Sequence, residues 1–437
     1  MIKRDCYIKQ LIAKKDNGLV KIITGVRRCG KSYLLFTLYK NYLNNIGVDD
    51  SHIIQIALDK RQHFSLRDPN KLYEYVIDKS KGEGRFYVFI DEIQLSYRIK
   101  RDDIDENRIA PEDRELMYVT FYDILNDLMS RSNLDIYVTG SNSRMLSKDV
   151  ATNFRGRGTE IRVYPLSFAE FYEYARLEKF EAWEEYMSFG GMPLVALESS
   201  KTEKAEYLRG LFSRIYISDI KERYKLRDEE ALSNLINVIF SAVGSLSNPH
   251  KLNNTMNSVL GIRLSDHTVA HYLEYLEDAF IIKKAVRYDV KGKSYLDFPS
   301  KYYAVDVGLR NARLNFRQQE KTHIMENIIY NELVCRGYSV DVGVVPTSSV
   351  IAGTQRKQNL EIDFVVNHGF SRTYIQSAFS IENEDKREQE IRSLLASGDF
   401  FRKIVIVNGN ELPHQDENGI TYVGVIPFLL NPEFLNI

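Results

Sequence analysis

The sequence contains little cysteine, and none of it is paired in a motif. Only 3 of the 437 residues are cysteine, namely Cys6, Cys29 and Cys335, and they lie far apart. Disulfide scaffolds and zinc sites need several closely spaced cysteines, so we expect neither. Sparse cysteine is typical of a protein from a reducing compartment.

Long apolar runs are also missing. A membrane-spanning helix needs roughly 18 or more successive apolar residues, and no stretch approaches that length. The first ten residues, MIKRDCYIKQ, are charged and lack the apolar segment of a secretion signal. We therefore expect a cytoplasmic protein with no membrane partner.

An excess of charge of one sign is absent too. The chain has 59 basic and 60 acidic residues, a net charge of -1. This balance argues against a protein coated in nucleic acid over its whole surface, but it leaves one local basic face open. With 437 residues, of which 44% are hydrophobic, the chain is long enough for several packed domains.

The first part of the chain alternates strand-like and helix-like segments. Apolar runs bounded by turn residues predict strands, and such runs separated by helices indicate a parallel sheet covered by helices, an α/β fold. A charged stretch, Tyr97–Arg114, interrupts the pattern and is interpreted as an exposed insertion. The expected elements are strands at Leu19–Thr24, Ile53–Leu58, Phe86–Ile90 and Ile136–Thr139, and a helix at Ser32–Leu43.

A phosphate-binding loop follows the first strand. Residues Gly25–Ser32 read GVRRCGKS, a complete G-x-x-x-x-G-K-[ST] motif between a strand and a helix. Its backbone N–H groups curl around phosphates, Lys31 reaches the β- and γ-phosphates, and the Ser32 hydroxyl binds Mg²⁺. We expect ATP to contact Gly25, Val26, Arg27, Arg28, Cys29, Gly30, Lys31, Ser32 and Tyr33.

A second motif ends the strand RFYVFIDE at Arg85–Glu92. Asp91 suits the shell of Mg²⁺, with Ser32 as the other expected metal ligand. Glu92 is placed to activate water as a general base.

Further candidates follow the strand Leu134–Thr139. A small polar side chain there, Ser141 or Asn142, is expected to touch the γ-phosphate or the attacking water. Arg155 and Arg157 are candidates for stabilising the charge that develops on that phosphate.

Cys29 has two interpretations. Neighbouring positive charge and a helix N-terminus lower the pKa of a thiol, so Cys29 is a candidate reactive residue. The alternative is an inert, packed side chain.

With these motifs, nearly the whole chain resembles a prokaryotic AAA+ family of uncharacterised ATPases whose C-terminal domain is partly nuclease-like. The resemblance implies ATP binding, a helical lid after PLSF, and a winged-helix domain. The implied domains are 1–164 (ATPase), 165–225 (lid), 226–315 (winged helix) and 316–437 (nuclease-like). The supporting motifs are ITGVRRCGKS at Ile23–Ser32, FIDEIQ at Phe89–Gln94, TGSNSRML at Thr139–Leu146, GRGTEIRVYPLSFAEFYEY at Gly156–Tyr174, GGMP at Gly190–Pro193, DIKERYKLRD at Asp219–Asp228, KYYAVDVGLRNA at Lys301–Ala312, ENIIYNELVCRGY at Glu326–Tyr338 and EIDFVV at Glu361–Val366.

The residues also support a winged helix independently. Ser265–Ala279 reads as a capped amphipathic helix, and Ile281–Ala285, then Asp289–Lys293 with Gly292, are expected to form a wing hairpin. Acidic residues on that helix would repel phosphate, so packing against the ATPase and contact with DNA both stay open.

The C-terminal segment resembles the PD-(D/E)xK nucleases. Glu326 is the candidate helix acid, and Glu361 and Asp363 lie on one side of a strand. The next strand places Gln376 and Ala378 where that family has an acid and a lysine. We therefore predict a nuclease-like fold without ordinary nuclease activity, in which a lysine from elsewhere, such as Lys386, could replace only the missing lysine.

The leading functional hypothesis is an ATP- and Mg²⁺-dependent ATPase that acts as a nucleotide-operated switch on a protein or DNA partner. An ATP-gated nuclease is the alternative, and a small-molecule kinase is the third hypothesis. The long C-terminal extension and the Asp91–Glu92 pair argue against the kinase. Oligomerisation is left open.

Overall fold

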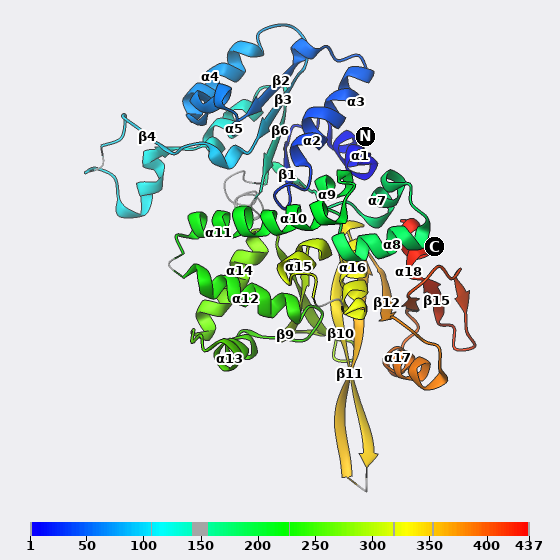
Figure 1. Ribbon diagram of the computed structural model, residues 1–437. Helices are drawn as coiled ribbons and strands as arrows, with labels where there is room; N and C mark the ends of the chain where they lie inside the picture. Colours follow the sequence, from blue (N-terminus) through cyan, green and yellow to red (C-terminus); the bar gives the residue numbers. More distant parts are fainter. Residues whose placement is uncertain are drawn as a thin grey trace. The chain divides into compact units, whose positions relative to one another are not determined.

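The computed structural model describes residues 2–105, 107–141, 156–226, 228–317, 320–351 and 354–435. The chain divides into two compact units, Met1–Val163 and Tyr164–Ile437. Each unit contains a β-sheet of its own (Figure 1).

The first unit is built on a parallel sheet of order β2-β3-β6-β1-β7. Four of its strands are those predicted from the apolar runs. The fifth was not predicted, because β7 has the sequence GTEIR and is only partly buried. The strands are β1 (Val20–Thr24), β2 (Ile53–Ala57), β3 (Phe86–Asp91), β6 (Leu134–Gly140) and β7 (Gly158–Arg162).

Helices cover this sheet and supply its core. Leu72 and Val76 of α4 and Leu125 of α5 pack with Val88 of β3 in one buried cluster. The predicted helix after the phosphate loop is present, but its middle turns are a π-helix, η1. The helices are α1 (Asp5–Lys14), α2 (Lys31–Tyr33), η1 (Leu34–Tyr39), α3 (Lys40–Asn45), η2 (Asp50–His52), η3 (Arg61–Arg67), α4 (Pro69–Lys79), η4 (Ile93–Leu95), η5 (Pro111–Met117) and α5 (Phe121–Met129).

The charged insertion forms a small hairpin of its own. Strands β4 (Ile99–Lys100) and β5 (Tyr118–Val119) pair in antiparallel fashion, with η5 between them. Several charges are paired locally, as in the ion pairs of Arg98 with Glu115 and of Arg101 with Asp103. Since most of the described side chains in the insertion are exposed, the structure confirms the interpretation of an exposed insertion.

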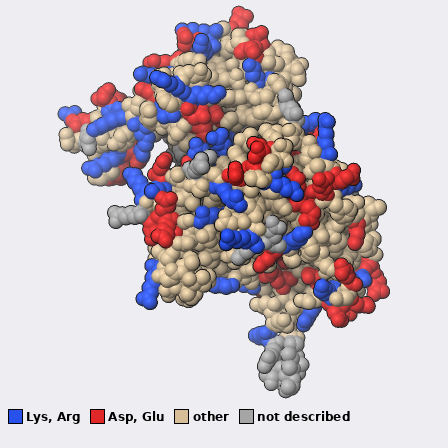
Figure 2. Space-filling view, viewed as in Figure 1, with Lys and Arg blue, Asp and Glu red and all other residues tan. Residues whose placement is uncertain are grey.

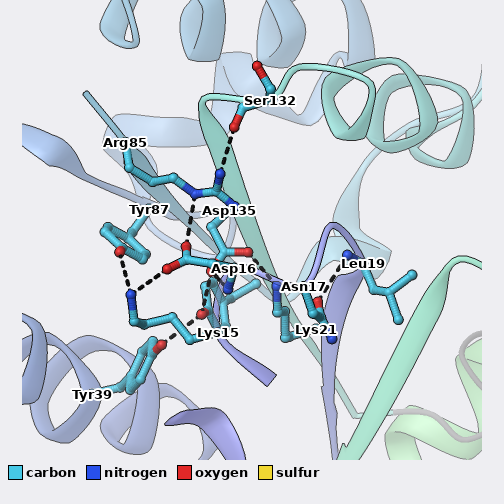
Figure 3. Close-up of polar contacts among 11 residues, drawn as sticks. Lys15, Asp16, Asn17, Leu19, Lys21, Tyr39, Arg85, Tyr87, Ser132 and Asp135 are labelled. Carbon is cyan, nitrogen blue, oxygen red and sulfur yellow. Dashed lines mark hydrogen bonds and ion pairs between the residues drawn. The ribbon is translucent and has the colours of Figure 1, made fainter. Parts of the chain in front are cut away.

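A buried polar network holds the amino-terminal end of this sheet (Figure 3). Lys21 of β1 forms an ion pair with Asp135 of β6, and both side chains are almost completely buried. Asp135 also accepts hydrogen bonds from the Tyr137 hydroxyl at 2.7 Å and from the Asp16 amide at 3.1 Å. Asp16 in turn pairs with Arg85 at 2.8 Å. The network therefore ties the segment after α1 to three strands, at the end of the sheet opposite to the phosphate loop.

The second unit contains a mixed sheet of order β14-β15-β13-β12-β11-β10-β8-β9. Its two central strands, β11 and β10, are also its longest and pair in antiparallel register. The strands are β8 (Ile282–Asp289), β9 (Ser294–Ala304), β10 (Ser339–Ile351), β11 (Thr354–His368), β12 (Ser371–Ala378), β13 (Arg402–Val407), β14 (His414–Gln415) and β15 (Thr421–Gly424).

The helices of this unit come mainly before its sheet in the sequence. In the residues that the structure describes, no helix has the length and apolar character needed to cross a membrane. The helices are α7 (Phe168–Ala175), α8 (Lys179–Phe189), α9 (Pro193–Leu197), α10 (Lys201–Leu211), η7 (Phe212–Tyr216), α11 (Ile217–Tyr224), α12 (Glu229–Ser241), α13 (Pro249–Leu260), α14 (Asp266–Asp278), α15 (Val307–Arg313), α16 (Lys321–Cys335), α17 (Glu384–Ala396) and α18 (Val425–Leu430).

The segment predicted as a winged helix contains a helix followed by a hairpin, as expected, but the hairpin belongs to a larger sheet. The Ser265 hydroxyl caps α14 by accepting a hydrogen bond from the Thr268 amide at 3.0 Å, as predicted. Strands β8 and β9 form a hairpin, as predicted, but β8 runs to Asp289 and β9 begins at Ser294, so the predicted second segment, Asp289–Lys293, is mostly the turn. However, β8 also pairs in parallel with β10 at Val342–Val344. The hairpin is therefore part of the same sheet as the strands after residue 316, and the sheet has no break at that expected boundary.

Candidate functional site

The phosphate loop lies at the carboxyl end of β1, and its glycines are required by local geometry. Gly25 has φ +144°, and a Cβ there would stand 2.1 Å from the Val163 carbonyl oxygen. Gly30 has φ +98° and precedes the first turn of α2. Both backbone conformations exclude most other residues. The sequence motif therefore specifies the loop conformation as well as its chemistry.

Lys31 is folded onto its own loop. Its ammonium donates hydrogen bonds to the carbonyl oxygens of Gly25 at 2.9 Å and Val26 at 3.1 Å, and the side chain is buried. Cys29 is fully buried as well, and its thiol donates to the Val163 carbonyl at 3.4 Å. The packed interpretation of Cys29 therefore fits the structure, and the reactive one does not, because reagents cannot reach the sulfur.

The two predicted Mg²⁺ ligands are neighbours. The Ser32 hydroxyl donates to Asp91 Oδ1 at 3.0 Å, although the two residues are 59 positions apart in the sequence. A hydroxyl and a carboxylate are the oxygen ligands that Mg²⁺ prefers. The residues present therefore fit a magnesium ion next to the phosphate loop.

Glu92 lies one residue beyond Asp91, in a strained and half-buried position. Its backbone is in the left-handed region, with φ 54° and ψ 49°. Burial raises the pKa of the Glu92 carboxyl; the nearby Lys31 lowers it, and Asp91 raises it further. The Gln94 amide donates to the Glu92 carboxylate and lies 3.4 Å from the Ser141 hydroxyl. A carboxylate with a raised pKa is suited to accept a proton near neutral pH.

Sequence reasoning missed Thr139, which joins these groups. Its hydroxyl donates to Asp91 Oδ1 at 2.5 Å and accepts a hydrogen bond from the Glu92 amide at 3.0 Å. Thr139 lies on β6, next to β3 in the sheet. The sequence did contain a sign of this role, because Thr139 stands near the end of a strand whose carboxyl end lies at the same edge of the sheet.

The last three site residues predicted from the sequence are Arg157, Asn142 and Arg155. Arg157 precedes β7, where its carbonyl accepts a hydrogen bond from the Val20 amide at 3.1 Å. Val20 begins β1, whereas the phosphate loop follows the end of that strand, on the order of 15 Å away at the usual rise per residue. The structure therefore does not bring Arg157 to the phosphate loop of its own chain. Asn142 and Arg155 lie outside the described residues.

The other residues of the loop differ in their exposure. Arg27 is half-buried, Arg28 is exposed with φ 71°, and Val26 is buried. Tyr33 ends the short helix α2 and is about one-third exposed. All four remain candidate contacts for a nucleotide.

A second polar cluster lies in the other unit, at the predicted nuclease-like acids. Glu326 of α16 and Glu361 and Asp363 of β11 all surround one buried ammonium, that of Lys301 on β9. The distances from Lys301 Nζ are 2.8 Å to Glu326, 2.8 Å to Glu361 and 3.4 Å to Asp363. The sequence had predicted the three acids but not this lysine.

The remaining predicted positions of this cluster differ from a nuclease site. Gln376 accepts a hydrogen bond from the Asp363 amide and donates to Glu390, so it acts as a structural link. Ala378 is buried, and Lys386 is exposed on α17. Among the described residues, no group of His, Cys, Asp and Glu side chains has the arrangement of a metal site.

Comparisons with known proteins agree with the geometry of the first unit. Residues 17–172 match a family described as an AAA domain, and residues 180–320 match a domain of unknown function, DUF8612. An uncharacterized protein of Haemophilus influenzae is 33% identical over 436 residues, covering 98% of this chain and 99% of that protein.

Two more distant similarities were found. An uncharacterized protein of Methanocaldococcus jannaschii is 29% identical over 411 residues, covering 90% of this chain and 80% of that protein. The solved structure of AMPPCP-bound DnaA from Aquifex aeolicus is 15% identical, with a TM-score of 0.29, and the match covers 62% of this chain and 86% of that one.

Proposed function

Because this chain belongs to the same family as the Haemophilus influenzae protein and contains an AAA domain, we propose that it binds and hydrolyses ATP with Mg²⁺. The observation that carries this proposal is the convergence of Lys31, Asp91 and Glu92 at one edge of the parallel sheet. Ser32 and Asp91 share a hydrogen bond of 3.0 Å there, and Thr139 links Asp91 to Glu92.

Each residue has a chemical role that follows from its position. The loop amides and the Lys31 ammonium hold the phosphate oxygens, which requires Lys31 to leave the carbonyls of Gly25 and Val26. Mg²⁺, held by Ser32 and Asp91, would neutralise charge on the β- and γ-phosphates. Glu92 takes the proton of the attacking water, and its raised pKa favours that transfer.

We propose further that hydrolysis operates a switch. Lys31 must give up its hydrogen bonds to the carbonyls of Gly25 and Val26 when a phosphate enters. The loop would therefore have two arrangements, one with and one without a bound phosphate, in which Lys31 has different partners. The long second unit and the Asp91–Glu92 pair fit a switch better than a small-molecule kinase.

Substitution of Lys31 tests nucleotide binding. Lys31→Ala should lose affinity for a fluorescent ATP analogue and lose phosphate release, because the variant lacks the charge that holds the phosphates. The matched control is Lys40→Ala, which removes an equal charge from α3 in the same unit. Unchanged affinity together with unchanged turnover in Lys31→Ala would contradict the assignment.

The structure gives no support to the nuclease alternative. In the cluster of the second unit, the Lys301 ammonium stands among the acids at the distances of direct ion pairs. We propose that this cluster is structural, since an ammonium at that point repels a divalent cation.

A further inference from the structure

Charges of both signs are mixed over the face of the molecule that Figure 2 shows, so this face does not indicate a partner of one charge. A more specific arrangement lies inside the first unit, beside the expected general base Glu92. There Gln94, the last residue of the FIDEIQ motif, contacts the Glu92 carboxylate. The roles proposed for the ATPase site leave this glutamine without one.

A short helical turn fixes the position of Gln94. Glu92 has left-handed backbone angles, and its carbonyl oxygen accepts a hydrogen bond from the Leu95 amide at 2.9 Å, which closes the turn η4. Ile93 is buried in the core cluster of the sheet, and Leu95 packs against that cluster. Gln94 therefore stands between two residues anchored in the core, so its backbone is fixed relative to the sheet.

The amide nitrogen of Gln94 joins the ends of two strands. Nε2 donates to Oε2 of Glu92, which follows β3, and to the hydroxyl of Ser141, which follows β6, at 3.4 Å. A primary amide has two N–H donors, and these two acceptors account for both. Strands β3 and β6 pair in parallel in the sheet. The side chain therefore ties the expected base to the strand end that carries Thr139 and Ser141.

The carbonyl side of the Gln94 amide has no such partner. Gln94 Oε1 is buried, and it accepts no hydrogen bond from the residues that the structure describes. The orientation of the amide is therefore set on its nitrogen side, by Glu92 and Ser141. An amide oxygen turned toward the Glu92 carboxylate would be repelled by it, so the carboxylate selects the orientation that is seen. Glu92 and Gln94 thus fix each other's positions.

The position of the Glu92 carboxylate matters for its proposed role. A general base has to lie within hydrogen-bond reach of the proton that it takes, and a misplacement of about 1 Å can slow an enzyme by on the order of a hundredfold. The Thr139 hydroxyl holds the backbone of Glu92 through its amide. The one hydrogen bond that the Glu92 carboxylate accepts from the described residues comes from Gln94.

We propose that Gln94 is a positioning residue of the ATPase site, which holds the Glu92 carboxylate where it takes the proton of the attacking water. This inference rests on the proposed function, since it needs Glu92 as the base. In the reaction the water oxygen bonds to the γ-phosphorus, the bond from that phosphorus to the bridging oxygen breaks, and Glu92 receives the water proton. Gln94 exchanges no proton and acts through Glu92.

Gln94→Met tests this role, because methionine is similar in length to glutamine and has no N–H donor. The turnover number (kcat) for ATP should fall by on the order of ten- to a hundredfold, since the base is no longer held in place. The Kd for ATP should change by less than about twofold, because Lys31 and Ser32 are unchanged. Gln94→Glu keeps the shape of glutamine but replaces the donor by a charge that repels Glu92. It should lose at least as much turnover, and it provides a second reading if circular dichroism shows that Gln94→Met is not folded.

A double variant separates positioning from support of the fold. If Gln94 acts through Glu92, its loss has no effect once the base is gone. Glu92→Gln/Gln94→Met should therefore turn over ATP within about twofold of the rate of Glu92→Gln alone. A glutamine that only stabilised the fold would lower both rates by the same factor.

The matched control is Gln55→Met on β2. It makes the same change at another half-buried glutamine of the first unit, one whose amide donates to the Phe36 carbonyl at 3.3 Å. Because this amide makes its hydrogen bond away from Glu92, the control should keep the turnover number of the wild-type protein.

Four outcomes would overturn this inference alone, given a wild-type protein that hydrolyses ATP and a Glu92→Gln variant that is slow. They are wild-type turnover in Gln94→Met, faster turnover in that variant, an equal loss in Gln55→Met, and a further loss of the same factor in the double variant. The proposed function fails by a different result, namely no hydrolysis by the wild-type protein or wild-type turnover in Glu92→Gln. Either of these would overturn the inference as well.

Discussion

Glu92 is a residue held in an unfavourable backbone conformation by its neighbours. Left-handed φ and ψ values in a residue other than glycine cost on the order of 1–3 kcal/mol and persist only where surrounding contacts impose them. Here the Thr139 hydroxyl accepts the hydrogen bond of the Glu92 amide. The same hydroxyl holds Asp91, so one side chain sets the positions of both acids.

Substitution of Thr139 tests this role. Thr139→Val keeps the shape of the side chain but removes both hydrogen bonds, so we expect ATP hydrolysis to fall by roughly tenfold or more while nucleotide binding is retained. Stability should fall by about 1–3 kcal/mol, because buried polar groups lose their partner. Phosphate release and urea denaturation measure the two effects.

Thr139→Ser is the control for this prediction. It keeps the hydroxyl and should keep most of the activity. A Thr139→Val variant that hydrolyses ATP at the wild-type rate would show that Thr139 does not position Asp91 and Glu92.

At the residue scale, the sequence predicted those parts of the site that belong to local motifs. Lys31 and Ser32 could be predicted because the loop spacing is fixed, and Asp91 because a buried strand ends there. Thr139 was not predicted, because its role depends on which strand lies beside β3. Arg157 was assigned to the site by its position in the sequence, and the register of β7 places it at the other end of the sheet.

Among the structural elements, β9 supplies Lys301, the residue of the ion cluster that the sequence did not predict. Its Lys301 is 3% exposed and is surrounded by carboxylates from α16 and β11. Coulombic attraction to these acids outweighs burial and raises the pKa of the Lys301 ammonium, while burial raises that of Asp363 to about 7. The lysine therefore joins three elements by charge.

Removal of that lysine should be strongly destabilising. We expect Lys301→Met to cost about 3–5 kcal/mol of unfolding free energy, since it leaves buried acids without their partner. Glu361→Gln should cost less than about 1 kcal/mol, because the Glu361 side chain is 36% exposed. Urea denaturation of the three proteins measures this, and equal stability of wild type and Lys301→Met would contradict it.

The elements themselves were easier to predict than their association. Alternation along the sequence placed Glu361 and Asp363 on one face of a strand, and both contact Lys301. The hairpin β8–β9 was predicted too, but its parallel pairing with β10 joins segments more than 50 residues apart. A pattern within one segment carries no information about such a partner.

On the scale of the whole molecule, the chain combines an AAA unit with a second unit that carries its own sheet. The first unit has the residues that we propose bind and hydrolyse ATP. The second has a buried ion cluster around Lys301, and among its described residues no group of His, Cys, Asp and Glu side chains has the arrangement of a metal site. We propose a nucleotide-operated switch as the function of this combination.

Hydrolysis by Glu92→Gln tests the central claim most directly. The variant keeps Asp91 for Mg²⁺ and Lys31 for phosphate but loses the carboxylate that accepts the proton. ATP binding and phosphate release are measured on the same preparation. The account predicts binding close to that of the wild type and hydrolysis slowed by about a hundredfold or more. Hydrolysis at the wild-type rate would contradict it.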